Sequence, residues 1–162
     1  YVARDSEGAA AWAERFAGEP HNARVIEEVG DEWAERDPVA AINWLNSLDT
    51  GAGKSAGLSS AFGEWARRDP QAASEHLITM PESPDRDSAI SGFSRRLASE
   101  NPEAAIAWAT EIHDASAREN ALVRAGQSMF RRDSSGTRAW LATSGLPQEA
   151  QQQIVNPPQH RR

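Results

Sequence analysis

The sequence predicts an all-α protein, an α-solenoid of about five stacked helix–turn–helix repeats. The main observation is a set of residue columns that recur every 32 positions, a period typical of helical hairpin repeats. An aromatic column contains Trp12, Trp44, His76, Trp108 and Trp140. A column of helix-capping side chains contains Asp5, Asp37, Asp69, Asn101 and Asp133. A third column, large and apolar, contains Tyr1, Trp33, Trp65, Leu97 and Met129.

The first helix of each unit is expected to begin at the capping column. Asp37 is followed by Pro38. An Asp side chain at the N-cap accepts a hydrogen bond from a backbone N–H of the first turn, and Pro is favoured at the next position, where no N–H is needed. Ile42 and Leu45 then continue an apolar stripe with helical spacing. The loop at 49–53, with two glycines, is expected to end this helix.

The second helix of the same unit is expected over about 54–68. The next Asp-Pro step stops it, because the residue before a proline is pushed out of the α region. The alternative, a bundle of long helices with accidental similarity between segments, conflicts with prolines at positions 38, 70 and 102. Stacked hairpins therefore remain the preferred interpretation, and their tryptophans are expected to form the core between units. These are Trp12, Trp33, Trp44, Trp65, Trp108 and Trp140.

The same signals divide the chain into units of one domain, 1–162. The expected units are the end of a preceding helix at 1–4, four repeats at 5–36, 37–68, 69–100 and 101–132, a final unit with a capping half-helix at 133–158, and a tail at 159–162. In the half-helix, Ile154 continues a column that contains Ile26, Leu58, Ile90 and Leu122. Because the chain begins within a unit, we expect it to be a fragment of a longer array.

Composition excludes several classes of function. The chain has no Cys, so disulfide scaffolds, Cys-based zinc sites and thiol catalysis are excluded. Its net charge of −7 argues against a general nucleic-acid binder. No stretch approaches the ~20 apolar residues of a membrane-spanning helix. Hydrophobic residues make up 39%, which is adequate for a thin solenoid that buries a single layer.

No segment has the pattern of a catalytic, cofactor or metal site. Gly53-Lys54-Ser55 resembles the end of a phosphate-binding loop, but Leu48 stands where that loop needs a Gly. The four histidines show no metal-binding spacing. His76 is interpreted as a partly buried aromatic filler in its column, with a ligand or pH-switch role as the alternative. The clustered carboxylates lie off the apolar columns and are interpreted as a solvated face. They are Glu27, Glu28, Asp31, Glu32 and Glu35.

The segment 33–45 carries the pattern W-A-x-x-D-P-x-A-A-x-x-W-L. This pattern resembles that of bacterial helical hairpin arrays of unknown function, and the architecture is similar to that of tetratricopeptide-like α-solenoids. The resemblance covers nearly the whole chain, although the chain lacks the Gly-x-x-Tyr that tetratricopeptide repeats place in their first helix. It implies a scaffold or interaction role and no specific mode of peptide binding.

The function expected from this architecture is a protein-interaction scaffold that binds a protein or peptide partner. Stacked hairpins form an extended surface, and the non-core positions of the first helices line one side of it. We call the candidate binding residues on that side the first-helix face: Asn43, Asn46, Gln71, Glu75, Glu103 and Thr110. The alternative is a structural spacer that self-associates head to tail. Neither hypothesis requires a catalytic residue, a cofactor, a metal or nucleic acid.

Overall fold

The computed structural model describes Gly8, Ala10, Ala11 and residues 22–157, and in this part of the chain every regular element is a helix. Asp5 and Trp12 of the first predicted helix lie outside the described residues, as do positions 1–4 and 159–162. The helices are α2 (Ala23–Ala34), α3 (Pro38–Ser47), α4 (Ala52–Arg68), α5 (Pro70–Thr79), α6 (Pro84–Leu97), α7 (Pro102–Thr110), α8 (Ala115–Arg132), α9 (Ser134–Leu141) and α10 (Gln148–Val155). The protein is therefore all-α over these residues, as predicted.

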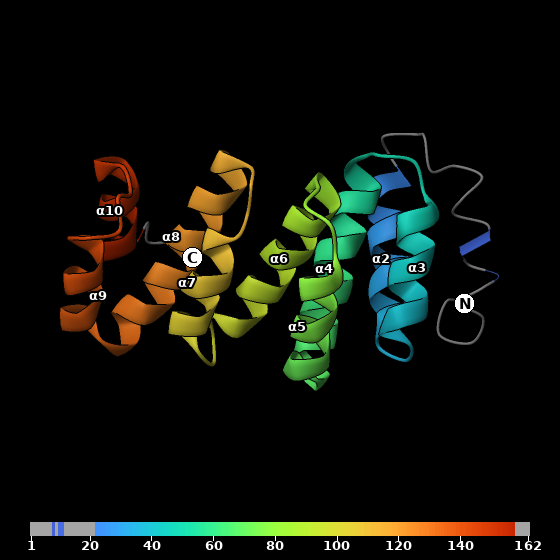
Figure 1. Ribbon diagram of the computed structural model, residues 1–162, viewed down its shortest axis with the longest axis horizontal. Coiled ribbons are helices and arrows are strands. Elements are labelled where there is room, and N and C mark those ends of the chain that lie inside the picture. Colours follow the sequence, from blue (N-terminus) through green and yellow to red (C-terminus); the bar gives the residue numbers. More distant parts are fainter. Residues whose placement is uncertain (1–7, 9, 12–21, 158–162) are drawn as a thin grey trace, which may run out of the picture.

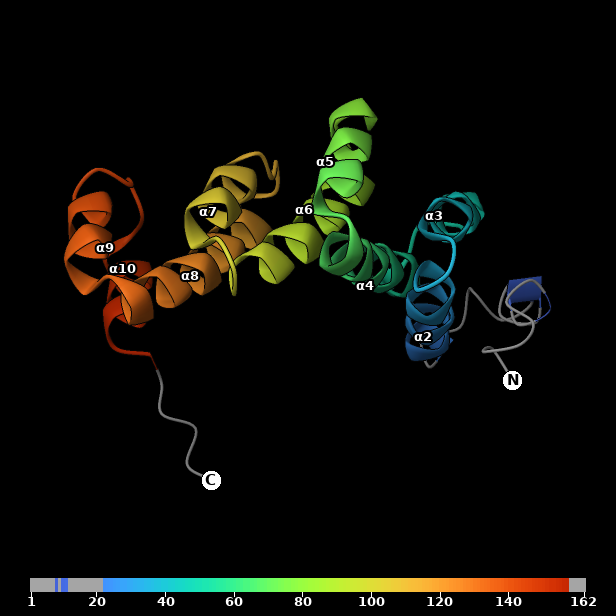
Figure 2. The ribbon, with the colours of Figure 1, turned by 90° about the horizontal axis from the view of Figure 1, so that it is seen from below.

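The helices form two layers in an elongated molecule, with α2 near one end and α10 at the other (Figure 1). The second-helix layer consists of α2, α4, α6, α8 and α10, each packed on the next. The first-helix layer consists of α3, α5, α7 and α9, which pack on the second helices. Helices of the first-helix layer stand apart from one another as separate ridges (Figure 2). Neighbouring first helices therefore pack mainly on second helices and not on one another.

Side-chain caps fix where the first helices begin. Asp37, Asp69 and Asn101 accept hydrogen bonds from the backbone N–H three residues later, at 3.0, 2.9 and 3.0 Å. Asp133 accepts one from the backbone N–H of Gly136 at 2.9 Å. Each bond satisfies a donor that the first helical turn cannot pair within itself. The four capping residues that the sequence predicts within the described residues are therefore present.

Cationic side chains cap the opposite ends of these helices. Lys54 Nζ donates to the carbonyl oxygen of Asn46 at 3.2 Å, and Arg86 Nε to that of Leu77 at 3.4 Å. Arg118 Nη1 donates to the carbonyl oxygen of Ile112 at 2.8 Å. A cation close to the C-terminal carbonyls of a helix is favourable for both hydrogen bonding and the helix dipole. The Lys54 side chain is nearly buried, so it has a structural role and not the role of a lysine in a phosphate-binding loop.

The core runs between the two layers along the molecule. Its fully buried large side chains include Ile26, Ile42, Leu45, Leu58, Phe62, Leu77, Ile90, Phe93 and Ile154. Trp44 and Trp65 are buried, whereas Trp33, Trp108 and Trp140 are only partly buried against the core. The five described tryptophans therefore all belong to the core or pack against it, and three of them keep part of their surface open to solvent.

Candidate functional site

The six residues of the first-helix face are all exposed, on α3, α5 and α7. They do not converge into a single pocket. Gln71 Nε2 donates to Glu75 Oε1 at 3.0 Å, and Thr110 Oγ1 donates to the carbonyl oxygen of Ala107 at 2.6 Å. The six side chains are thus exposed to solvent, but Gln71, Glu75 and Thr110 already form hydrogen bonds within their own helices.

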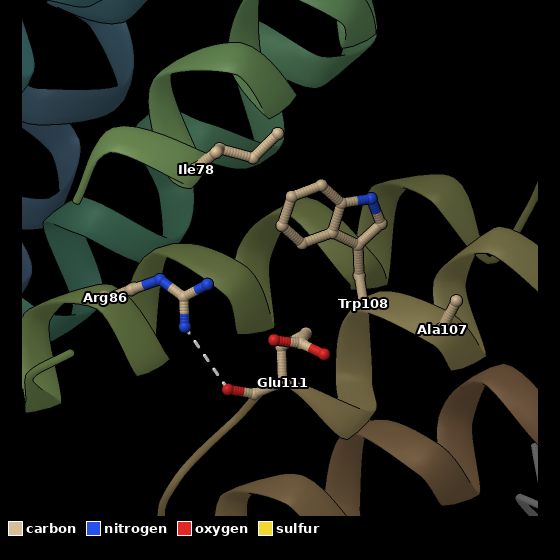
Figure 3. Close-up of a pocket in the computed structure, with 5 residues that line it drawn as sticks. All are labelled: Ile78, Arg86, Ala107, Trp108 and Glu111. Carbon is tan, nitrogen blue, oxygen red and sulfur yellow. Dashed lines mark hydrogen bonds between the residues drawn. The ribbon is translucent and has the colours of Figure 1, made fainter. Parts of the chain in front are cut away.

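A groove of about 350 Å³ lies on this side of the molecule, between α5 and α7 and above α6 (Figure 3). We call it the α5–α7 groove. The residues that line it are Ile78, Arg86, Ala107, Trp108 and Glu111. Ile78 is 70% exposed, the most exposed large hydrophobic residue of the described chain. An aliphatic side chain in solvent beside a tryptophan is a feature of binding surfaces more than of folding cores.

Trp108 and Arg86 have fixed positions in this groove. The Trp108 ring meets the Phe93 ring edge to face, with centroids 5.2 Å apart and planes at 72°. This contact anchors the indole on α6, while its other side faces the space toward Ile78 (Figure 3). Arg86 Nε donates to the carbonyl oxygen of Leu77 and Nη1 to that of Glu111, both at 3.4 Å. The guanidinium thereby links the ends of α5 and α7 at the floor of the groove.

The groove lining contains one carboxylate, Glu111, and one guanidinium, Arg86. Glu111 lies at its edge, and Glu103 is two helical turns earlier on the same side of α7. Beyond that end, Glu82 Oε2 lies 3.6 Å from His113 Nε2. Helices α3, α5 and α7 contain no Lys or Arg. Arg86 is therefore the only Lys or Arg among the residues that line the groove, and two carbonyl oxygens already accept its hydrogen bonds.

The opposite side of the molecule carries the clustered carboxylates of α2. Burial, followed by the negative charge of Glu64 and then Glu35, raises the pKa of Asp31 above the ordinary value. Arg67 on α4 pairs with Glu64, and Ser60 Oγ donates to Glu27 Oε1 at 3.1 Å. Within the residues that the structure describes, no group of His, Asp or Glu side chains is arranged to hold a metal ion. These carboxylates form a charged, hydrated surface.

His76 contacts two aromatic rings of α4. Its ring centroid lies 5.4 Å from that of Trp65 and 5.9 Å from that of Phe62. The imidazole thus occupies the position in the hairpin that tryptophan occupies in neighbouring units, and it is partly buried there. This placement agrees with the interpretation of His76 as an aromatic filler.

Sequence reasoning did not identify most of the α5–α7 groove. It treated Trp108 as core, and it gave Arg86, Ala107 and Glu111 no binding role. One signal was available, since Ile78 aligns with the polar residues Asn46 and Thr110 in the neighbouring units. A large aliphatic residue at this exposed position is a local departure from the repeat pattern.

Comparison with protein-family models, with curated proteins and with solved structures finds no match to the chain. Among the helices of the described residues, none is both long and apolar enough to cross a membrane.

Proposed function

We propose that the chain is an α-solenoid of five hairpin repeats with a 32-residue period, and that it acts as a protein-interaction module. Support for the repeat comes from α3, α5, α7 and α9, which begin at Pro38, Pro70, Pro102 and Ser134. Support for the function comes from the α5–α7 groove, where the exposed Ile78 lies opposite the partly buried Trp108. The partner is a protein or peptide that lies across the first-helix layer.

The architecture favours a partner of this kind for a physical reason. Separate ridges leave grooves wide enough for side chains of a second molecule, and a helical scaffold holds those grooves at fixed spacing. Grooves between helices of a solenoid accept extended or helical segments, with apolar anchors that supply affinity and polar groups that supply specificity. The α5–α7 groove has both kinds of group.

A peptide-display selection on the intact chain tests this proposal. Enriched peptides are titrated into isotope-labelled protein, and the shifted amide resonances are mapped onto the helices. We expect the shifts to concentrate on α5 and α7, and to be lost with the variant Ile78→Asp. A control variant, Asn46→Asp, adds the same charge on α3, outside the groove, and should retain binding. Shifts confined to α4, α6 and α8, or a failure to enrich any peptide, would contradict the proposal.

A self-associating spacer is the second candidate, and the charge distribution favours it. Four carboxylates lie on α2 and a fifth, Glu35, at its C-cap, whereas α8 carries Arg124, Arg131 and Arg132 near the other end of the molecule. Opposite charges at opposite ends favour head-to-tail contact at low salt. Light scattering coupled to size exclusion distinguishes the two candidates, because a spacer gains mass as the salt concentration falls and a monomeric module does not.

A further inference from the structure

The α5–α7 groove differs from the neighbouring grooves of the same layer. The 32-residue alignment places Asn46 and His76 between α3 and α5 at the positions of Ile78 and Trp108. Between α7 and α9 it places Thr110 opposite Trp140. Within the described helices, the α5–α7 groove is thus the one in which this alignment sets a large aliphatic side chain opposite a tryptophan. The pairing of Ile78 with Trp108 is therefore a feature of this groove and does not follow from the repeat.

Two carboxylates, Glu103 on α7 and Glu111 at its C-cap, are unpaired among the residues that the structure describes. Glu103 and Glu111 accept no hydrogen bond through their side chains and form no ion pair within the described residues. They lie on one stripe of α7 with Ala107, which lines the groove between them. Helices α5 and α7 contain no Lys or Arg, so Arg86 of α6 is the only cation among the residues that line the groove.

Arg86, the one cation in the groove lining, forms no ion pair with the carboxylate of Glu111. Its guanidinium is held at the floor by the carbonyl oxygens of Leu77 and Glu111. Figure 3 shows it on the α6 side of the groove, while Ile78 and Trp108 stand above it. Ile78 and Glu111 are exposed to solvent, whereas Trp108 and Arg86 are only partly exposed.

We infer that the α5–α7 groove takes a peptide segment in which a large apolar side chain is followed closely by Arg or Lys. The apolar side chain sits between Ile78 and Trp108, and the cation pairs with Glu111, with Glu103 extending the acidic edge. The inference rests on the proposed interaction function, which it makes specific. Burial of the anchor supplies most of the affinity, because an exposed ion pair contributes little, and the carboxylates select the sign of the flanking charge.

The test uses three blocked synthetic peptides in a Gly-Ala-Ser background. One has a Leu followed by two Arg residues, the second replaces Leu by Ala, and the third replaces both Arg by Glu. Each is titrated into the isotope-labelled chain, and dissociation constants are read from amide shifts on α5 and α7 and from the Trp108 indole N–H. We expect the Leu-Arg peptide to bind on the order of tenfold more tightly than the Ala-Arg peptide. We expect a preference of about fivefold over the Leu-Glu peptide.

Three variants test the inferred specificity. Glu111→Arg should reverse the charge preference, so that the Leu-Glu peptide binds more tightly than the Leu-Arg peptide. Glu28→Arg on α2 changes the net charge equally, away from the groove, and should leave the preference unchanged. Ile78→Ser should weaken all Leu peptides roughly tenfold while the helical circular dichroism stays the same.

The outcomes separate the two proposals. Equal affinity for the three peptides, or an unchanged preference with Glu111→Arg, overturns the inferred specificity. If display-selected peptides still map to α5 and α7 in that case, the interaction function stands and only the chemistry of the partner is wrong. If neither selected nor designed peptides shift the first-helix layer, both proposals fail.

Discussion

Single side chains determine where the first helices of this protein begin. The carboxylate of Asp69 accepts the backbone N–H of Ala72, and Pro70 follows it with a backbone already restricted to helical φ. The same arrangement occurs at Asp37 and Asn101. These caps are short-range features, so the sequence alone is sufficient to predict them.

Asp69→Ala should lower the free energy of unfolding by about 0.5–2 kcal/mol, because the Ala72 N–H loses its acceptor at a helix end. Urea denaturation followed by circular dichroism measures the change. Asp49→Ala is the matched control, since Asp49 is exposed in the α3–α4 loop and its side chain caps no helix. Equal effects of the two substitutions would show that capping is not the cause.

Gly92 is required where the backbones of α4 and α6 meet. A Cβ atom at this position would collide with the carbonyl oxygen of Ser59, which is main chain and cannot move aside alone. We therefore expect Gly92→Ala to push the helices apart and to destabilise the protein by about 1–3 kcal/mol.

Gly63→Ala provides the control for that substitution. Gly63 lies on α4, across from Gly92 on α6. A Cβ atom added at Gly63 would have the carbonyl oxygen of Gly92 as its nearest contact at 3.5 Å, an ordinary packing distance. Here alanine should stabilise the helix by about 0.5–1 kcal/mol through its higher propensity. Thermal unfolding of both variants should give shifts of opposite sign, and a stabilised Gly92→Ala variant would contradict the close approach.

At the scale of helices, the sequence predicted their existence and order, because caps, prolines and apolar stripes are local. It predicted boundaries less well, and α4 begins at Ala52, inside the loop expected at 49–53. It could not predict how far apart neighbouring first helices stand, since that distance depends on contacts between units. The partial exposure of Trp108 and the groove beside Ile78 follow from that distance, so both were beyond sequence reasoning.

Helix α2 carries a cluster of carboxylates, and Asp31 lies among them. Since the raised pKa means that the folded protein binds the Asp31 proton more tightly than the unfolded chain does, ionised Asp31 lowers stability at neutral pH. That loss disappears as the pH falls through the raised pKa toward the ordinary value of 3.8.

Asp31→Asn should therefore raise the unfolding temperature at pH 7, and the gain should shrink steadily as the solution is acidified. The gain should also shrink at high salt, which screens Glu64 and the other neighbouring carboxylates. Asp49→Asn, in the exposed loop, controls for the substitution itself. A gain that is constant across the acidic range would exclude the electrostatic explanation.

At the scale of the whole molecule, each helix of the second-helix layer packs on its immediate neighbours. The principal contacts of α10 are with α8, and those of α2 are with α3 and α4. The buried column that contains Ile26 and Ile154 belongs to one continuous core cluster, which runs along the molecule through successive interfaces between neighbouring helices. Stability should then be close to a sum of units and nearest-neighbour terms, as expected for a repeat array.

Ile154→Ala tests this directly by hydrogen exchange. The side chain is fully buried on α10, where it contacts the α8 segment at Gly126, and its truncation should cost about 2–5 kcal/mol at that interface. We expect faster amide exchange in α8, α9 and α10, with α2 and α3 unchanged. Ile26→Ala, in the same column at the other end, should give the mirror pattern, with faster exchange in α2, α3 and α4.

The two variants together decide between a chain of interfaces and one cooperative core. In a single two-state domain, either truncation lowers the free energy of global opening, so the protected amides of both ends would exchange faster to the same extent. In an array, protection is lost locally and falls off with distance from the substitution. Equal acceleration of α2 and α10 by Ile154→Ala would thus refute nearest-neighbour stability, and with it the energetic basis of the proposed solenoid.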